Sequence, residues 1–315
     1  MKNTFSIFFI MLSINSQLFT SCEKEIVYEN GITDLTGAYF GQQPPGTKPE
    51  QFGPAIIKGN QRRNWHGKTG FSPDGNRFFM EFYFMDSANP IQVLEMVQEE
   101  GYWTVPARPG FANGYLHASP AFMDNGTSIL FITNRPDAGS WGLMTSDLTG
   151  AGWSAPKPFI VSGSSGLGGG FEVSVARNGN VYTRLEELNA GNATDIFLLC
   201  KENGRYLPPE NLGPNINSIA AEDGPFIDPD EEYLLFVRRV PANGNGDIYI
   251  SFRKADGAWE PAQKMDSGIN TSHEESCPYV SPDKKYLFFT RYKSGIRNPW
   301  WINSSVIEEL KSKDL

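Results

Sequence analysis

Apolar and polar residues alternate along this chain in short runs that recur at a nearly constant distance. A turn motif that begins on an apolar residue occurs five times, at Phe71–Gly75, Phe122–Gly126, Val175–Gly179, Ile227–Glu231 and Val280–Lys284. The second residues of successive motifs are 51, 53, 52 and 53 positions apart. Because Asp-Gly and Asn-Gly turns favour positive φ and join antiparallel strands, the pattern predicts five similar β-rich units.

Each unit is predicted to be a meander of four short strands. Second strands follow the turns, at Arg77–Phe84, Ser128–Thr133, Val181–Leu185, Tyr233–Val237 and Tyr286–Thr290. Third strands are predicted at Asp195–Leu199, Asp247–Ile250 and Trp300–Ile302. Fourth strands are predicted to begin near aromatic residues that repeat in register, at Trp103, Trp153, Tyr206 and Trp259. These repeated aromatics are expected to pack between the units rather than to bind a ligand.

The fifth unit lacks a fourth strand, and the N-terminal part of the chain is predicted to supply it. Lys48–Pro54 is similar in sequence to Leu207–Pro214, which lies at the fourth strand of the third unit. We therefore predict an all-β, five-bladed propeller of four-stranded antiparallel blades over residues 36–303, closed by an N-terminal strand, which removes free sheet edges. Residues 304–315 contain a capping-box pattern and are predicted to form a short helix.

Two of these motifs carry a resemblance to a known repeat family. The Phe-Ser-Pro-Asp-Gly turn at 71–75 and the Gly-Asp-Ile-Tyr-Ile strand at 246–250 resemble the PD40 (WD40-like) repeats of TolB-type propellers. The resemblance covers nearly all of residues 36–303, although the third unit has Arg177-Asn178 in place of Pro-Asp. It implies the fold and selects no single function, because the family includes periplasmic scaffolds, peptidase propellers and oligogalacturonide lyases.

The N-terminal residues have the pattern of an export signal. Residues 1–21 carry one charge, Lys2, before an apolar run that is too short to span a bilayer. The segment that ends at Cys22 resembles a bacterial lipoprotein signal, with Phe19 where leucine is usual. We expect lipidation at Cys22, a tether over 22–35, and anchoring by lipid alone in the outer membrane or periplasm of a Gram-negative bacterium. An ordinary cleaved signal is the alternative.

Composition and charge narrow the classes of partner. The chain has 315 residues, a net charge of −9 at pH 7 and a pI of about 5.0, which argues against binding to nucleic acid. We expect a monomer. An exported protein could join Cys200 to Cys277, but the run around each residue favours two free, partly buried thiols.

Candidate chemistry comes from positions that should be equivalent in the five units and yet differ. Six residues before the second residue of each turn motif stand His66, His117, Gly170, Glu222 and Glu275. Because first strands line a propeller axis, we expect these side chains at one mouth, where the His and Glu residues could act as catalytic acid and base or hold a divalent metal. The alternative is that they are polar residues that line a wet channel. His273 precedes the same strand in the fifth unit.

A second set of residues could contact a ligand at this mouth. Two positions after the first column stand Lys68, Ser119, Glu172, Gly224 and Cys277, of which Lys68 and Glu172 are candidate ligand-binding residues and Cys277 a possible nucleophile. Arg184, Arg238 and Arg291 end second strands and could hold a carboxylate, or else pair with acidic residues of the neighbouring unit. Trp65 has no repeat equivalent and is a candidate platform for sugar stacking.

Three functions are compatible with these residues. The first is a binding module for a glycan or other anionic oligosaccharide. The second is a glycan-cleaving enzyme, a lyase or hydrolase, that uses the His and Glu column with a possible divalent metal at the axis. The third is a TolB-like scaffold that binds an envelope protein.

Overall fold

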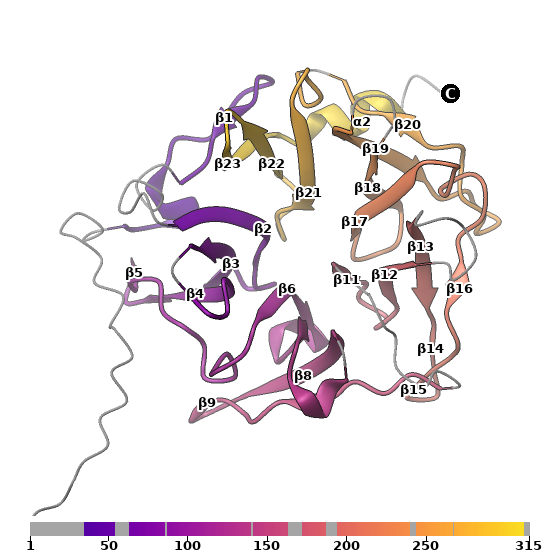
Figure 1. The fold of residues 1–315 in the computed structure, drawn as a ribbon. Coiled ribbons are helices and arrows are strands. Elements are labelled where there is room, and N and C mark those ends of the chain that lie inside the picture. The colour runs from indigo at the N-terminus through magenta and orange to yellow at the C-terminus, as the bar shows by residue number, and fades with distance from the viewer. Residues whose placement is uncertain are drawn as a thin grey trace, which may run out of the picture.

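The five predicted units form five antiparallel β-sheets around a central axis, which confirms the five-bladed, all-β propeller (Figure 1). The computed structural model describes residues 35–53, 63–85, 87–139, 141–162, 172–186, 194–239, 244–266 and 268–311. The predicted signal peptide and Cys22 lie outside these residues. Within them, no helix is long and apolar enough to cross a membrane.

The blades are numbered 1 to 5 along the chain, and each begins with its innermost strand. Blade 1 contains β2 (Arg63–Phe71), β3 (Arg77–Phe84), β4 (Ile91–Glu99) and β5 (Tyr102–Trp103). Blade 2 contains β6 (His117–Met123), β7 (Ser128–Thr133), β8 (Gly142–Thr149) and β10 (Lys157–Pro158), with β9 (Gly152–Trp153) also paired to β8. Blade 3 contains β11 (Val173–Val175), β12 (Val181–Glu186), β13 (Thr194–Leu199) and β16 (Glu210–Asn211), and a separate hairpin, β14 (Lys201–Glu202) and β15 (Arg205–Tyr206), lies between its last two strands in sequence.

The last two blades follow the same order. Blade 4 contains β17 (Ala221–Ile227), β18 (Tyr233–Arg239), β19 (Gly246–Phe252) and β20 (Gln263–Lys264). Blade 5 contains β21 (Glu274–Val280), β22 (Tyr286–Lys293), β23 (Ile296–Asn303) and the N-terminal β1 (Glu50–Gln51). Figure 1 shows β2, β6, β11, β17 and β21 nearest the centre.

The repeated turns adopt the backbone conformation that their sequences predict. The fifth residue of every turn motif has positive φ, namely Gly75 (76°), Gly126 (90°), Gly179 (90°), Glu231 (58°) and Lys284 (58°). Glycine adopts this region without steric cost, whereas Glu231 and Lys284 hold it against their own preference. Each turn joins the first strand of its blade to the second strand, so all five turns lie at one face of the ring, which we call the turn face. The opposite face, where the inner strands begin, is called the mouth.

The N-terminal strand closes the ring as predicted. Glu50 lies opposite Trp301 and Gln51 opposite Trp300 in the antiparallel pair of β1 with β23. The matching segment of blade 3 supplies β16 at Glu210–Asn211, so the sequence similarity between the two segments reflects one structural role. Phe52 follows β1, donates its backbone N–H to the carbonyl oxygen of Pro299 at 2.9 Å, and is fully buried.

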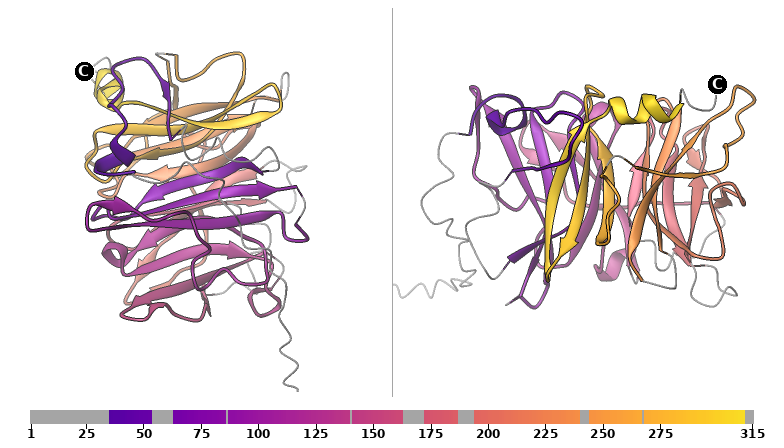
Figure 2. Two further views of the ribbon diagram at one scale, coloured as in Figure 1. Left: turned by 90° about the vertical axis from the view of Figure 1, so that its left-hand side faces the viewer. Right: turned by 90° about the horizontal axis from the view of Figure 1, so that it is seen from above.

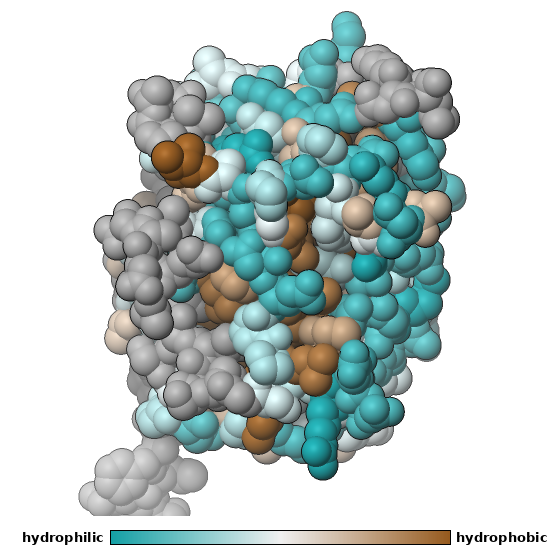
Figure 3. Space-filling view, turned by 90° about the vertical axis from the view of Figure 1, so that its right-hand side faces the viewer, coloured by the Kyte–Doolittle hydropathy of each residue, from teal (hydrophilic) through white to brown (hydrophobic). Residues whose placement is uncertain are grey.

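Aromatic and aliphatic side chains fill the space between blades. Trp103, Tyr206 and Trp259 are each less than one-tenth exposed and Trp153 is partly buried, so the predicted core role of these aromatics is confirmed. The predicted C-terminal helix is α2 (Ser305–Lys311), which lies at one face of the ring (Figure 2) and buries Val306 and Ile307. The side of the ring in Figure 3 is mostly hydrophilic, with hydrophobic areas near its middle.

Candidate functional site

A β-bulge in the inner strands decides which side chains reach the axis. In four blades the pairing register of the first strand with the second strand is interrupted. The interruptions lie between Trp65 and Thr69, Ala118 and Ala121, Asp223 and Phe226, and Ser276 and Tyr279. Equivalent residues at or beside these bulges have positive φ, namely Ser119 (51°), Glu172 (72°), Gly224 (62°) and Cys277 (53°). A bulge adds one residue and redirects the side chains around it. The axis is therefore lined by the second column of the sequence, not by the first.

The bulge residues of all five blades meet in what we call the axial cluster: Lys68, Ser119, Glu172, Gly224 and Cys277. Lys68 crosses from blade 1 and donates hydrogen bonds from Nζ to the carbonyl oxygen of Val173 in blade 3 and to that of Pro225 in blade 4, the latter at 2.9 Å. The Val173 N–H donates to Ser119 Oγ at 2.8 Å, and the Cys277 thiol donates to Glu172 Oε1 at 3.4 Å.

Burial dominates the electrostatics of the axial cluster. Loss of solvent lowers the pKa of Lys68 to about 8. Loss of solvent, with repulsion from Asp223, raises the pKa of Glu172 to about 7. Glu172 Oε2 is buried and has no hydrogen-bond partner among the described residues. A Cβ on Gly224 would lie 2.9 Å from this oxygen, so a larger residue at this position would displace the Glu172 carboxylate.

Cys277 does not have the environment of a nucleophile. Its thiol is buried, and burial raises its pKa well above the ordinary value, which favours the unreactive protonated form. The prediction of two free thiols is confirmed, since neither Cys200 nor Cys277 forms a disulfide.

Glu222 and Glu275, predicted as catalytic or metal-binding residues, are instead buried parts of single blades. Glu275 accepts hydrogen bonds from the Thr271 N–H and hydroxyl, at 3.0 and 2.7 Å, and from Arg291 Nε at 2.7 Å. Glu222 repeats this arrangement one blade earlier, where Arg238 Nε donates at 2.7 Å. Both carboxylates are fully buried.

The same contacts correct the predicted roles of Arg238 and Arg291. Their guanidinium groups are held by glutamates of their own blades, not of the neighbouring blades, and by backbone carbonyl oxygens such as that of Ile216. Each of these two guanidinium groups therefore already has a carboxylate partner in its own blade. Arg184, in β12, lies near Glu172 and lowers its pKa.

His117 is also not at the axis. Its side chain is buried in blade 2 beside the rings of Phe111 and Phe131, and Nδ1 lies 2.9 Å from the carbonyl oxygen of Tyr115. Burial lowers its pKa to about 4, so the imidazole is neutral at pH 7. This is the environment of a core histidine, and the expected place at the axis is not the one that the structure gives.

Two further predictions concern neighbours in β2. Trp65 is 1% exposed and packs against Phe78 and Phe82, so it belongs to the core and offers no ring face to a sugar. His66 lies at the mouth with its side chain 31% exposed, and its Nδ1 is 2.5 Å from Glu81 Oε1.

The predicted metal site is not assembled. His66 lies at the mouth and His117 in the core of blade 2, whereas Glu222 and Glu275 occupy equivalent buried positions of blades 4 and 5; Gly170 is outside the described residues. Within the part of the chain that the structure describes, no group of three or more His, Cys, Asp or Glu side chains is placed to hold a metal ion.

A continuous set of side chains does lie at the mouth of blades 1, 4 and 5. We call it the mouth patch; its members are His66, Tyr83, Arg239, Glu274, Tyr292 and Arg297. The rings of His66 and Tyr83 stack with centroids 6.0 Å apart. Arg297 donates from Nη1 to the carbonyl oxygen of His66 at 3.2 Å, and its guanidinium carbon lies 5.6 Å from the ring centroid of Tyr292.

The charged members of the mouth patch form an ordered row. Glu274 accepts hydrogen bonds from Arg297 at 3.0 Å and from Arg239 at 3.1 Å, and Arg239 also donates to Asp223 at 2.9 Å. Tyr83 and Tyr292 are 36% and 42% exposed, so solvent reaches their rings. His273, predicted to bind ligand, precedes β21 and is half-buried, with its backbone N–H donated to Thr271 Oγ1.

Sequence reasoning missed Glu81, which connects the mouth to the axial cluster. Glu81 is buried in β3, where Oε1 contacts His66 and Oε2 accepts the Ser119 N–H at 2.7 Å. A Cβ on Gly67 would collide with this carboxylate. The available signal was a single carboxylate in the middle of an otherwise apolar strand, where a charged residue is costly unless it has partners.

Comparisons with known proteins bear on the fold. No protein-family model and no curated protein matches the chain. The structure resembles TolB from Acinetobacter baumannii (12% identity, 74% of this chain and 53% of that chain, TM-score 0.45) and the tricorn protease (15%, 71% and 20%, 0.45). It also resembles an endo-arabinase from Bacteroides thetaiotaomicron (14%, 83% and 96%, 0.48).

These resemblances are limited to architecture. The chain spans about half the length of the TolB chain and about a fifth of the tricorn protease chain. At identities of 12–15% the likeness extends to the propeller fold alone. The chain is a five-bladed β-propeller.

Proposed function

We propose that this protein is a cell-envelope binding module that takes a glycan or other anionic oligosaccharide at its mouth. The observation that carries the proposal is the mouth patch, in which the exposed ring of Tyr292 lies beside the guanidinium of Arg297 and the exposed ring of Tyr83 stacks with His66. Tyrosine offers a flat apolar face with a polar edge, which suits the alternating C–H and hydroxyl surface of a sugar ring. The mouth patch is open to solvent, and an open site can take a chain of several sugar rings, whereas a closed site cannot.

The arginines supply preference for acidic sugars. Arg239 and Arg297 share Glu274, and this contact fixes the positions of both guanidinium groups. Each arginine has five N–H donors, of which these contacts use only a part. The remaining donors can bind a uronate carboxylate or sugar hydroxyls in a planar geometry that lysine could not reproduce.

Isothermal titration calorimetry tests the proposal with acidic and neutral oligosaccharides of equal length, oligogalacturonate and oligogalactose. We expect the acidic ligand to bind, and Tyr292→Ala to weaken binding at least tenfold, about 1.4 kcal/mol. Tyr102→Ala is the matched control, because Tyr102 is 58% exposed on the outer strand β5 and should leave the affinity unchanged.

Three results would contradict the proposal. They are no heat with any acidic oligosaccharide, equal affinity for the neutral one, and equal losses in Tyr292→Ala and Tyr102→Ala. An envelope protein that still co-purifies with Tyr83→Ala and Tyr292→Ala variants, in the absence of any sugar binding, would favour a TolB-like scaffold instead.

The location in the envelope is a separate part of the proposal. It rests on the apolar run before Cys22 and on the resemblance of that segment to a lipoprotein signal. Metabolic labelling with a palmitate analogue should mark the wild-type protein, and Cys22→Ala should lose both the label and the membrane association. A labelled Cys22→Ala protein would overturn lipidation at this residue.

A further inference from the structure

The first described residues enter the propeller at the turn face. The Leu35 carbonyl oxygen accepts the Trp103 N–H at 2.8 Å, and the Gly37 N–H donates to the Gly101 carbonyl oxygen at 3.3 Å. The Trp103 indole N–H also donates to the Gly37 carbonyl oxygen at 2.8 Å. These contacts lie at the hairpin between β4 and β5, and β4 runs from the mouth to the turn face. The chain is therefore fixed to the turn-face rim of blade 1.

The next residues fix this entry point to the place where the ring closes. The Tyr39 hydroxyl donates to Asp283 Oδ1 at 2.7 Å, and Asp283 belongs to the turn motif of blade 5. Phe40 is buried, with its ring edge-to-face against Phe78 and Trp103 of blade 1. In the right-hand view of Figure 2, this indigo segment lies at the same edge of the ring as α2, which follows the turn-face end of β23. The entry point is thus a rigid part of the propeller.

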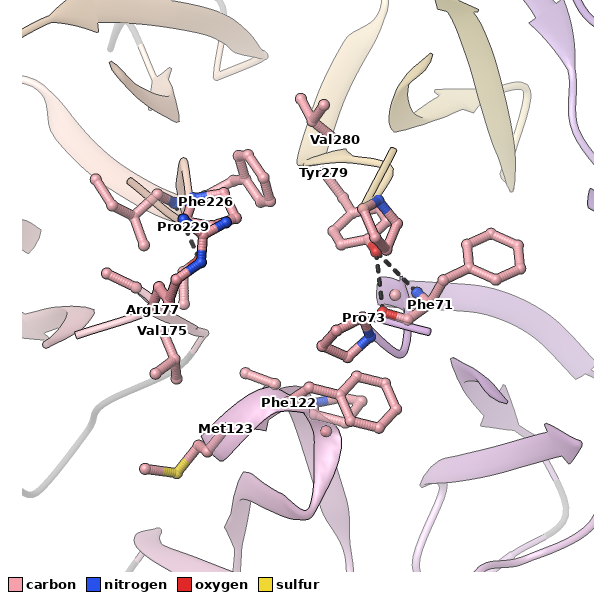
Figure 4. A pocket seen from close by; sticks show the side chains of 18 of the residues that line it. Phe71, Pro73, Phe122, Met123, Val175, Arg177, Phe226, Pro229, Tyr279 and Val280 are labelled. Atoms are coloured by element: carbon pink, nitrogen blue, oxygen red, sulfur yellow. Dashed lines mark hydrogen bonds between the residues drawn. The ribbon is translucent and has the colours of Figure 1, made fainter. Parts of the chain in front are cut away.

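The turn face itself is tied together and polar. The Tyr279 hydroxyl accepts the Phe71 N–H at 2.9 Å and donates to the Phe71 carbonyl oxygen at 3.1 Å, which ties blade 5 to blade 1 (Figure 4). Exposed charges of the turns form ion pairs, such as that of Lys285 with Asp283 at 3.3 Å. Among the residues of the five turn motifs, all of which the structure describes, no large hydrophobic side chain is exposed. Such a surface can lie beside hydrated lipid head groups without inserting into the bilayer.

The mouth has the opposite character. Among the described residues, nine large hydrophobic side chains are exposed, and most of them stand at the mouth ends of blades 1, 2, 4 and 5. The residues at the mouth are Tyr83, Met85, Tyr115, Ile219, Tyr292 and Ile296. Exposed apolar groups that gather on one face mark a surface that meets a partner. The face that offers contacts to a partner is therefore opposite to the face at which the chain enters.

The length of chain between the expected anchor and the entry point limits how the ring can sit on a membrane. Cys22, which lies outside the described residues, precedes Leu35 by 13 positions, and a chain of that length spans at most about 45 Å. Lys285 and Lys293, at the turn-face and mouth ends of β22, are eight positions apart, which corresponds to about 26 Å. With the mouth toward the membrane, more than half of the available reach would be needed only to pass the blade.

We propose that the lipid-anchored protein holds its turn face toward the membrane and presents its mouth to the opposite side. This inference rests on the proposed function and names the source of its ligand. The mouth takes free saccharide chains that arrive from the side away from the membrane, and not the sugar head groups of lipids in the anchoring membrane. Both sources can carry the same acidic sugar, so the orientation of the ring is what separates them.

Energy transfer from two positions on one strand tests the orientation. The lipidated protein is placed in vesicles of phosphatidylethanolamine and phosphatidylglycerol in which a fraction of the head groups carries rhodamine. A donor dye is attached at Lys285→Cys or at Lys293→Cys, two exposed lysines, in a background with Cys200→Ser, while Cys277 is buried. Transfer from position 285 should be at least twofold greater than transfer from position 293. The same labelled proteins with Cys22→Ala are the matched controls and should show no transfer.

A second measurement separates the two sources of ligand. Free oligogalacturonate should bind the anchored protein and the Cys22→Ala protein with affinities within twofold of each other. A galacturonosyl diacylglycerol in the same vesicles should not compete with it. Competition by this glycolipid, or at least tenfold weaker binding of the free oligosaccharide to the anchored protein, would overturn the proposal. Equal transfer from the two positions, or greater transfer from position 293, would overturn it as well.

The oligosaccharide site and the orientation can fail separately. If no acidic saccharide binds to either form, the proposed site at the mouth is refuted, and the comparison of energy transfer still decides the orientation. Equal transfer from an anchored protein that binds oligogalacturonate would refute the orientation alone. A wild-type protein without lipid at Cys22 would refute the anchor and this inference together and would leave the oligosaccharide site intact.

Discussion

Replacement of Glu275 by alanine is expected to destabilise the fold and to leave ligand binding by the folded protein unchanged. Glu275 is fully buried and accepts hydrogen bonds from Thr271 and from Arg291, whose side chain is 10% exposed. Removal of one member of a buried pair leaves the other charge uncompensated, which costs about 3–5 kcal/mol. Since the free energy of unfolding of an ordinary domain is only about 5–15 kcal/mol, we expect Glu275→Ala to leave little folded protein.

A milder variant and a double-mutant cycle make the magnitude measurable. Glu275→Gln retains the size and one acceptor oxygen, so we expect a loss of roughly 1–3 kcal/mol, the cost of a hydrogen bond to a charged group. Urea denaturation of Glu275→Gln, Arg291→Gln and the double variant should give a coupling energy within the range of about 0.5–3 kcal/mol seen for residues in contact. Glu202→Ala, at an exposed position in β14, should stay within about 0.5 kcal/mol of the wild type.

The outcome separates a structural role from a catalytic one. The structural role would be refuted if each single variant lowered the free energy of unfolding by less than about 1 kcal/mol, the two losses were additive, and Glu275→Gln lost ligand binding. Glu275 would then belong to a functional site. The Glu222–Arg238 pair offers an independent repeat of the experiment in the neighbouring blade, with the same 2.7 Å contact.

Three further predictions follow from other parts of the structure. Phe52→Ala should lower the free energy of unfolding by about 3–5 kcal/mol, because Phe52 anchors the closing strand and is fully buried; a loss below about 1 kcal/mol in urea denaturation would refute closure by this segment. Folding raises the pKa of Glu172 from 4.5 to about 7, so its carboxyl keeps a proton that the unfolded chain releases, and its contribution to stability falls as pH rises through this interval. Glu172→Gln should therefore gain stability over the wild type between pH 5 and 7, by at most about 3 kcal/mol in denaturation curves, and a constant difference would contradict the raised pKa. Folding lowers the pKa of His117 from 6.5 to about 4, so stability is lost as pH falls through this interval, and His117→Phe should be less sensitive to acid over the same range.

The parts of the fold that depend on local sequence could be predicted closely. The strands predicted at Arg77–Phe84 and Ser128–Thr133 coincide with β3 and β7, because glycine and asparagine turns fix where each strand begins. The closing strand could also be predicted, since Glu50–Gln51 and Glu210–Asn211 occupy equivalent places in similar segments. In a repeat protein each unit gives independent evidence about the others.

The candidate site could not be predicted in the same way, because it depends on a bulge. Strict alternation along β2 and its equivalents places residues such as His66 and Glu275 toward the axis. The register shift adds two residues before Thr69 in blade 1 and one residue at the equivalent places of blades 2, 4 and 5, and the side chains there turn to other directions. Lys68 and Glu172 were named as ligand-binding candidates, but their contact with residues of other blades depends on closure of the ring.

A spacing pattern in the sequence nevertheless distinguishes the two columns. Ser218 and Thr271 stand four residues before Glu222 and Glu275, and Arg238 and Arg291 stand sixteen residues after them. Such a triplet, repeated with identical spacing, is typical of a structural motif inside each blade, whereas His66 and His117 lack it. The axial cluster shows the opposite behaviour, since its five members are lysine, serine, glutamate, glycine and cysteine. Residues that face the shared axis meet different neighbours in each blade, so repeat symmetry does not constrain their identity. Positions that vary between blades and lack a repeated triplet of this kind are therefore the positions at which this propeller can acquire specificity.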